Sequence, residues 1–531
     1  MMLSAAAAAL LAAPLTLAAR ADTTITNNTK DALDTTKAGN ITIQAGGGVE
    51  IKASEPAVTI DSNNFLSSEG GITNENTSNA IGVEVNTTNG NIVSSGGILN
   101  LGSISLSGPG AGKSALLIEG GNTYFAPITL ETVTTTAGSA ATTVTGSSID
   151  VEGDQSNDFT LVQGTTIDGD VVIGGSMGLT RSLNSNVAGD TAVDLEGNLE
   201  GNFQLAEGAS ISALGNQARG VVILGPISAC QDNASVGYTC ANSGTALAST
   251  GGFYNFGSIS VAGVQIPNHR LQADLESGSA VVIGNSVAGG FLNAGPSTGN
   301  TSIPTATISG NGDIGVTGNG QIFSPVLLID PSQSVTITQA IVRGPALFGP
   351  VPNTVDSVDG SATGYAFINH GTISGTPIDP DISSQAVVIQ GSSAANYTCL
   401  SGSASACVGV PSSTFTAATQ SGPWVTQGGL LDTGTISAQA TTRENTTFNV
   451  SSEALFIGAF TTVPRLDVSG EFISGTTFTA GSISAVVGGP GGGVATAVQI
   501  GAQAVVPQID VMQHANITAT VQTSTLSPDI T

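Results

Sequence analysis

The nine residues KSALLIEGG, Lys113–Gly121, contain the short phrase that decides the fold of this chain. Their centre, Ala115-Leu116-Leu117-Ile118, is one copy of a phrase, Ala-[Val/Leu/Ile]-x-[Ile/Val/Leu], that keeps returning along the sequence. Self-similarity of this kind is the signature of a repeat architecture. The other copies stand at 57–60, 80–83, 192–195, 280–283, 386–389, 454–457 and 497–500.

The same stretch invites a second interpretation, because Gly112-Lys113-Ser114 matches the end of a phosphate-binding loop. The first glycine of that motif is missing, since its position is Ser107. A phosphate loop also opens a helix, whereas Ser114–Gly121 is a short apolar run that ends in Gly-Gly. The sequence therefore predicts that Lys113 and Ser114 form a turn before a buried strand.

Two further phrases recur between the copies of the first. One is an apolar residue followed by x-Asn-x-Gly, and the other is Gly-x-Ile-Ser. Their asparagines are Asn100, Asn255, Asn293 and Asn369, and the Gly-x-Ile-Ser copies stand at 102–105, 257–260, 371–374, 434–437 and 481–484.

These phrases describe short strands, because β-branched runs bounded by Gly, Asn, Ser and Thr favour strands and tight turns. Such a strand buries its apolar face only when coils stack about 4.8 Å apart, placing Ile on Ile and Asn on Asn. We therefore expect an all-β chain, a right-handed parallel β-helix that is elongated and carries loop insertions. At roughly 20–25 residues per coil it would form about 20–25 coils, a rod on the order of 100 Å long.

A string of β-sandwich domains is the rival fold. Its strands should be longer, more regularly alternating and richer in Tyr and Trp, but Trp424 is the one tryptophan of the chain. A helical protein is disfavoured, because glycine accounts for 71 of the 531 residues and charged residues for only 9%. The net charge of −27 repels nucleic acid, so no nucleic-acid partner is expected.

The N-terminus has the pattern of an export signal. Leu3–Ala19 is rich in Ala and Leu, and Ala19-Arg20-Ala21 offers a small-x-small cleavage site, so residues 1–21 are predicted to be a signal peptide. Residues 22–531 are predicted to form the exported β-helix. Export favours disulfides, and the spacing of the four cysteines predicts the pairs Cys230–Cys240 and Cys399–Cys407. Each pair would close a loop insertion, one near 224–252 and the other near 390–428.

The recurring phrases, together with the stretch Ala497–Val521, resemble the Gly/Ala/Ser/Thr-rich passenger region of bacterial autotransporters. The resemblance implies display at the cell surface or release outside the cell, and a β-barrel of the outer membrane as the partner in cis. It also implies that the chain is the N-terminal part of a longer reading frame. The expected role is adhesion, aggregation or that of a stalk, with host, glycan or self surfaces as partners.

Candidate chemical motifs are few, and each has a structural explanation. Gly174–Gly178 matches the G-x-S-x-G pattern around Ser176, but no helix is predicted after it. The histidines lack partners in sequence, the calcium-like Gly310–Asp313 occurs once, and Pro380 separates Asp379 from Asp381 in a predicted loop. We therefore predict no catalytic residue, no cofactor and no metal ion. A β-helical polysaccharide lyase or hydrolase remains the alternative, since related folds gather carboxylates on one face.

Overall fold

The chain is described by a computed structural model that covers residues 21–522 with internal gaps. The gaps are residues 95, 108–109, 131–133, 136–141, 144–147, 153–155, 181–189, 216, 241–249, 264–277, 295–306, 311–312, 315–321, 324, 330–345, 349–364, 378–379, 390–396, 400–406, 410–423, 427–428, 444–449, 460, 462, 474–476, 503 and 513. The predicted signal peptide therefore lies almost wholly outside the described residues.

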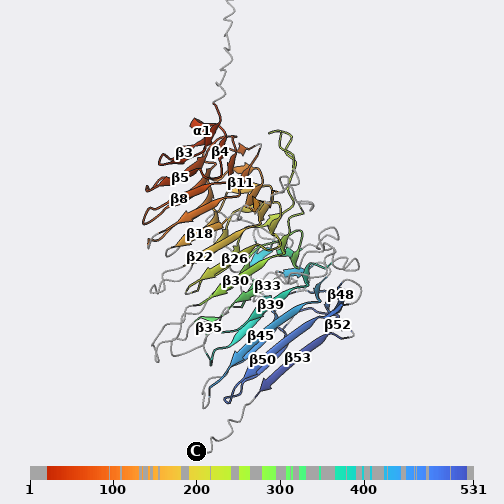
Figure 1. Ribbon diagram of the computed structural model, residues 1–531. Helices are drawn as coiled ribbons and strands as arrows, with labels where there is room; N and C mark the ends of the chain where they lie inside the picture. The colour runs from red at the N-terminus through yellow and green to blue at the C-terminus, as the bar shows by residue number, and fades with distance from the viewer. Residues whose placement is uncertain are drawn as a thin grey trace, which may run out of the picture.

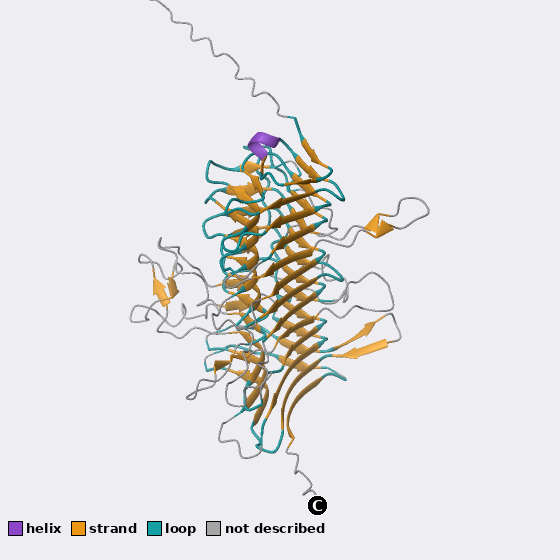
Figure 2. Cartoon of the chain, turned by 60° about the vertical axis from the view of Figure 1, so that its left-hand side comes forward, coloured by secondary structure: helices purple, strands orange, loops and turns teal. Residues whose placement is uncertain are grey.

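The chain winds into a parallel β-helix, which confirms the fold predicted from the phrases (Figures 1 and 2). Each coil passes through three parallel sheets, here called A, B and C, and then returns to sheet A one level further along the rod. Several coils add a short strand of a fourth sheet, D, between sheets C and A. The strands are short because each sheet occupies only one side of the coil.

Sheet A consists of β1 (Thr23–Ile25), β4 (Ile41–Ile43), β7 (Leu66–Ser68), β11 (Ile98–Asn100), β15 (Ile128–Leu130), β21 (Val171–Ile173), β25 (Phe203–Leu205), β29 (Phe253–Asn255), β32 (Phe291–Asn293), β38 (Phe367–Asn369), β44 (Leu430–Asp432), β47 (Leu466–Val468) and β52 (Ile509–Val511). Sheet B consists of β2 (Asn28–Thr29), β5 (Gly48–Ile51), β8 (Gly71–Asn74), β12 (Ser103–Leu106), β18 (Ser148–Glu152), β22 (Ser176–Thr180), β26 (Ser210–Leu214), β30 (Ser258–Ala262), β33 (Thr307–Gly310), β39 (Thr372–Gly375), β45 (Thr435–Thr441), β50 (Ser482–Gly488) and β53 (Asn516–Gln522).

Sheet C consists of β3 (Leu33–Asp34), β6 (Val58–Ile60), β9 (Ile81–Asn86), β13 (Ser114–Glu119), β19 (Asn157–Leu161), β23 (Thr191–Leu195), β27 (Arg219–Ile223), β31 (Val281–Ile283), β36 (Leu327–Ile329), β40 (Ser384–Ile389), β46 (Ser451–Ile457) and β51 (Val494–Ile500). Sheet D consists of β10 (Ile92–Val93), β14 (Thr123–Phe125), β20 (Thr166–Asp168), β24 (Asn198–Glu200) and β28 (Ile227–Ser228). Two-stranded pairs form outside these sheets: β16 (Thr134–Thr135) with β17 (Thr142–Thr143), β34 (Asp313–Ile314) with β35 (Ile322–Phe323), β37 (Ala346–Phe348) with β43 (Trp424–Thr426), β41 (Tyr397–Cys399) with β42 (Cys407–Gly409), and β48 (Gly470–Ile473) with β49 (Thr477–Ala480).

The last residue of the opening phrase forms a continuous aliphatic ladder inside sheet C. Ile118 pairs with Val85 on one side and with Leu161 on the other, and its side chain is fully buried. The ladder runs through Ile60, Val85, Ile118, Leu161, Leu195, Ile223, Ile283, Ile329, Ile389, Ile457 and Ile500. The repeat therefore specifies the inner face of one sheet.

One copy of the phrase is out of register. Leu116 pairs with Val83, so this coil contributes Gly82–Val85 to the ladder rather than the predicted 80–83. Gly82 stands where other copies have Ala, because a Cβ there would lie 2.6 Å from the backbone oxygen of Ala115. The sequence phrase alone did not reveal this close approach.

The predicted number of coils was wrong. Over the residues that the structure describes, sheets A and B each contain 13 strands, not 20–25, which makes this stack about 58 Å long at the usual strand spacing. Coils are longer than expected because many carry insertions: the ladder residues Asn293 and Asn369 lie 76 residues apart in the sequence.

The two ends of the stack differ. At the first end, α1 (Thr35–Ala38) begins after Asp34, whose carboxylate accepts a hydrogen bond from the amide of Thr36. At the other end, the last described coil carries the exposed large hydrophobic side chains of the described chain: Val494, Ile500, Val505, Ile509, Val511, Met512 and Val521. No further coil of the described chain packs on these side chains. Among the described residues, no helix has the length and apolar character needed to cross a membrane.

Candidate functional site

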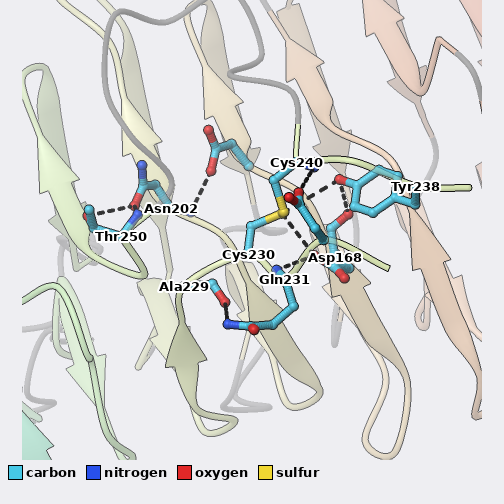
Figure 3. The surroundings of a disulfide bond; sticks show 10 residues. Asp168, Asn202, Ala229, Cys230, Gln231, Tyr238, Cys240 and Thr250 are labelled. Carbon is cyan, nitrogen blue, oxygen red and sulfur yellow. Dashed lines mark hydrogen bonds between the residues drawn. A yellow bond between two sulfur atoms is a disulfide. The ribbon is translucent and has the colours of Figure 1, made fainter. Parts of the chain in front are cut away.

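A disulfide-closed insertion covers the end of sheet D (Figure 3). The insertion leaves after β28 and returns before β29, and Cys230 and Cys240 form the disulfide that their spacing predicted. Asp168, the last residue of β20, lies directly against it, with its Oδ1 3.0 Å from the Sγ of Cys230. The two sulfurs and the carboxylate lie within 4.8 Å of one another.

The insertion is held by groups other than the disulfide. The Tyr238 hydroxyl donates a hydrogen bond of 2.6 Å to the backbone oxygen of Asp168, and its ring centroid lies 5.3 Å from that of Phe125. Where the insertion returns, the fully buried Asn202 Oδ1 accepts hydrogen bonds from the amides of Thr250, Gly251 and Gly252. The loop is therefore fixed at its middle and at its return.

The carboxyl of Asp168 is electrostatically unusual. It is only 1% exposed, and burial raises its pKa to about 6, with the charges of Glu200 and Asp232 adding to the rise and the Gln231 amide opposing it. Burial also raises the pKa of Glu200, which pairs with Asp168 on the next coil. A disulfide sulfur is neither a thiolate nor a zinc ligand, so this group becomes a candidate S,S,O metal site only after reduction.

Opening the disulfide is expected to loosen the insertion without unwinding the rod. The variant Cys230→Ser/Cys240→Ser should lose at most on the order of 2.5–3 kcal/mol, the chain-entropy value for a loop of this size. Tyr238→Phe, which removes only the hydroxyl bond to Asp168, is the matched smaller change. Limited proteolysis between residues 229 and 252 should accelerate, while the far-ultraviolet circular dichroism stays unchanged. Loss of β-structure in the double serine variant would contradict this expectation.

The second predicted disulfide lies partly beyond what the structure describes. Strands β41 and β42 are antiparallel and place Cys399 opposite Cys407. The side chains of these two residues lie outside the described part of the chain, so the bond itself stays a prediction. Peptide mapping without reduction would test it.

Lys113 directly precedes the buried strand β13, as predicted, but its side chain is itself buried. It is 1% exposed, and its ammonium donates a hydrogen bond of 2.9 Å to the backbone oxygen of Ser107. The backbone amide of Lys113 donates a hydrogen bond to the Ser156 hydroxyl, and the backbone amide of Ser156 donates one to the carboxylate of the fully buried Asp190. Ser114 begins β13 and is also buried. Lys113 thus belongs to a buried polar corner shared by three coils.

Lys113→Ala is therefore expected to destabilise the protein by about 2–3 kcal/mol, since it removes a buried aliphatic stem and a hydrogen bond made by a charged group. Lys113→Met keeps most of the stem and should lose less if packing dominates. Thermal unfolding of both variants measures the difference. An unchanged unfolding midpoint for Lys113→Ala would show that the buried stem and its hydrogen bond contribute little to stability.

The other candidate residues take structural positions. Ser176 is the first residue of β22 and is exposed, so no nucleophile elbow forms there. The Nδ1 of His370 lies 2.5 Å from the Thr433 hydroxyl, and His514 is exposed. Asp381 forms a 3.9 Å ion pair with Arg443. His269, Asp379 and part of Gly310–Asp313 lie outside the described residues.

Three asparagines of the second phrase form a buried ladder at the end of the strands of sheet A. Asn255 Nδ2 donates to Asn293 Oδ1 at 2.8 Å, Asn293 Nδ2 donates to Asn369 Oδ1 at 2.8 Å, and Asn369 Nδ2 donates to Asp432 Oδ1 at 2.7 Å. All four side chains are fully buried. Phenylalanines two positions earlier stack in parallel, with ring centroids of Phe253 and Phe291 5.2 Å apart. The predicted stacking of Asn on Asn is confirmed for Asn255, Asn293 and Asn369, whereas Asn100 lies between Ser68 and Leu130 of the neighbouring coils.

Asp432 interrupts this ladder with a carboxyl group. Its Oδ2 is buried and has no hydrogen-bond partner. Burial raises the pKa of Asp432 to about 7, against the lowering effects of the Asn369 amide, the Gly434 amide and the nearby His370. The group therefore changes charge near neutral pH inside the core.

Sequence reasoning missed Asp168, Asn202 and Asp432. A signal for the first two was present, because TIDGD (166–170) and NLEGN (198–202) repeat an apolar-acid-Gly pattern and pair in register in sheet D. Asp432 stands in LLDTG, which aligns with the asparagine phrase only once the coils are stacked.

The disulfide, the polar corner at Lys113 and the asparagine ladder therefore hold an insertion and the interior of the rod in place. Comparison of the chain with protein-family models, with curated proteins and with solved structures finds no match.

Proposed function

We propose that this chain is an exported β-helix displayed at a bacterial surface, where it acts as an adhesive, aggregating or stalk-like structure. The observation that carries the proposal is the outer surface of sheet B. From β22 to β53 its first and third positions carry almost only Ser and Thr, and the described side chains among them are exposed or half-buried. A long regular rod with one open polar side presents the same chemistry repeatedly along its length.

A β-helical enzyme that acts on polysaccharides is the alternative. Asp168 and Glu200, paired carboxylic acids with raised pKa values, are the observation in its favour. The disulfide-closed insertion covers Asp168, which leaves its carboxyl group 1% exposed. Such closure disfavours access by a polymer.

Display of the chain on a bacterial cell tests the proposal. Cells that carry it should sediment faster or adhere better than cells that display the Ile118→Asp variant, whose coils should not stack. Release of reducing ends from a panel of polysaccharides, abolished by Asp168→Asn, would instead support the enzyme. Equal sedimentation and adherence of both cell types would reject the adhesive role.

A further inference from the structure

The contact between Asp168 and the disulfide lacks the proton of a hydrogen bond. Figure 3 shows Asp168 beside the two cysteines, and its Oδ1 lies 3.0 Å from the Sγ of Cys230. A sulfur in a disulfide carries no proton, and a carboxylate carries none either. When the disulfide is open, the Cys230 thiol can donate to this oxygen. The carboxylate is therefore better matched to the open, dithiol form of the loop than to the closed form.

The three donor atoms of this cluster already lie close enough to share one metal ion. The two sulfurs and a carboxylate oxygen of Asp168 lie within 4.8 Å of one another, the one such group of three found among the described residues. The ligands of a tetrahedral zinc ion lie about 3.3–3.8 Å apart, given metal–ligand bonds of about 2.0–2.3 Å. Small side-chain shifts would thus bring the three atoms onto one ion. Asp168 and Cys230 lie 62 residues apart in the sequence, so the stacking of coils makes the cluster.

Bonds that do not involve sulfur hold the two cysteines near each other. Asn233 and Tyr238 exchange two backbone hydrogen bonds, of 2.9 and 3.0 Å, so the chain runs antiparallel on either side of the turn between them. The Tyr238 hydroxyl holds this turn to the backbone of Asp168, and the amide of Cys240 donates a hydrogen bond of 2.8 Å to the Asp232 carboxylate. These bonds limit how far the two thiols separate once the disulfide is open, although protease would reach the loop more often.

The surroundings of the cluster favour a cation. The charges of Glu200 and Asp232 act on Asp168, and that of Asp170 acts on the neighbouring Tyr238, so several acidic groups converge here. Both cysteines are half-buried, which leaves the sulfurs a path to solvent. Calcium and magnesium take oxygen ligands, whereas zinc binds thiolate sulfur and carboxylate oxygen together. The donor set therefore selects zinc.

We propose that reduction of the disulfide creates a zinc site formed by the sulfurs of Cys230 and Cys240 and the carboxylate of Asp168, with water as the fourth ligand. A dithiol supplies the two electrons and two protons that convert the disulfide into two thiols, and is itself oxidised to a disulfide. Zinc then displaces both thiol protons and binds the thiolates. The oxidised loop offers no thiolate, so it does not bind the ion. This redox-gated site is independent of the surface role proposed above.

The test uses the full chain with one pair of cysteines left. The variant Cys399→Ser/Cys407→Ser, here called the two-cysteine chain, is reduced with a dithiol, freed of the reductant without air and titrated with Co²⁺ and then Zn²⁺. Cobalt bound to thiolates gives a sulfur-to-metal charge-transfer band, which zinc should remove as it displaces cobalt. The reduced chain should bind one ion, and the oxidised chain none. Calcium should leave the cobalt band unchanged.

Matched variants of the two-cysteine chain separate ligation from simple attraction. Asp168→Asn should weaken zinc binding at least about tenfold, because it replaces an anionic ligand with an amide. Asp232→Asn removes a neighbouring charge but no ligand, so it should weaken binding less. Further substitution by Cys230→Ser/Cys240→Ser should abolish the cobalt band. Circular dichroism verifies that each variant keeps its β-structure.

Proteolysis gives a second measurement that does not depend on a spectrum. Cleavage between residues 229 and 252 should be faster in the reduced two-cysteine chain than in the oxidised one, and zinc should slow it again. Equal zinc affinity of Asp168→Asn and its parent would overturn the proposal. A reduced chain that gives no cobalt band, or an oxidised chain that binds zinc equally well, would overturn it too.

Discussion

Ile118→Asp is expected to unfold the coils around β13 and to cost about 5 kcal/mol or more. Ile118 is fully buried and lies between Val85 and Leu161 in the aliphatic ladder of sheet C. Loss of the side chain alone is worth about 2–5 kcal/mol, and a buried carboxylate without a partner adds several more. Since each coil is supported by its neighbours, the damage should spread along the stack.

The neighbouring Leu117 provides the control, because it faces outward on the same strand and is half-buried. Leu117→Asp would place a carboxylate opposite Glu84 and should cost at most about 1 kcal/mol. Thermal unfolding and protease mapping of coils 81–195 measure both variants. If Ile118→Asp melts within a few degrees of the unaltered chain, the ladder does not hold the rod together.

Asp432→Asn is expected to stabilise the protein at pH 8 by up to about 4 kcal/mol. The pKa of Asp432 is raised from 3.8 to about 7 in the folded chain, so the folded state binds this proton more tightly than the unfolded state. The contribution of protonated Asp432 to the free energy of unfolding is therefore fully present below pH 4 and is lost as the pH rises through 7. A shift of about three pKa units, at about 1.36 kcal/mol per unit, lowers the free energy of unfolding by about 4 kcal/mol once Asp432 is ionised. An amide at this position would avoid that loss.

The new amide is also expected to find a hydrogen-bond partner. Asn293 Nδ2 and Asn369 Nδ2 each lie 3.4 Å from the backbone oxygen of a threonine in the next coil, Thr372 and Thr435 respectively. Ser482 pairs with Thr435 in the following coil, so we expect its backbone oxygen to be the equivalent acceptor for an amide at position 432. The substitution would thus extend the ladder by one member.

Urea unfolding between pH 4 and 8 measures this effect. Asp432→Asn should match the unaltered chain near pH 4 and exceed it increasingly toward pH 8. The reverse change, Asn369→Asp, should give a protein that is weakest at pH 8 and partly recovers in acid. Parallel pH profiles for Asp432→Asn and the unaltered chain would show that this carboxyl does not titrate in the core.

Elements that short stretches of sequence specify were predicted well. The phrase in KSALLIEGG predicted the strand and its buried residues, and the asparagine phrase predicted the ladder from Asn255 to Asn369. The phrase in KSALLIEGG did not predict the register of the strand, because β9 pairs two residues further along than the phrase indicates and β19 carries no copy of the phrase. Cys230 and Cys240 lie ten residues apart, so their pairing needed little knowledge of the rest of the fold. The burial of Lys113 escaped prediction because its partners Ser107 and Ser156 are set by neighbouring coils.

The sequence by itself determined that this chain is a stack of short parallel strands, because side chains that alternate along each strand must find identical neighbours to bury them. Only the tertiary structure decided how many coils form and which residues meet across them. Asn369 and Asp432 lie 63 residues apart, and the pairing of β38 with β44 brings them into hydrogen-bond contact. Register across an insertion depends on the packing of whole coils, and that non-local choice also placed the hydroxyls of sheet B on one open face.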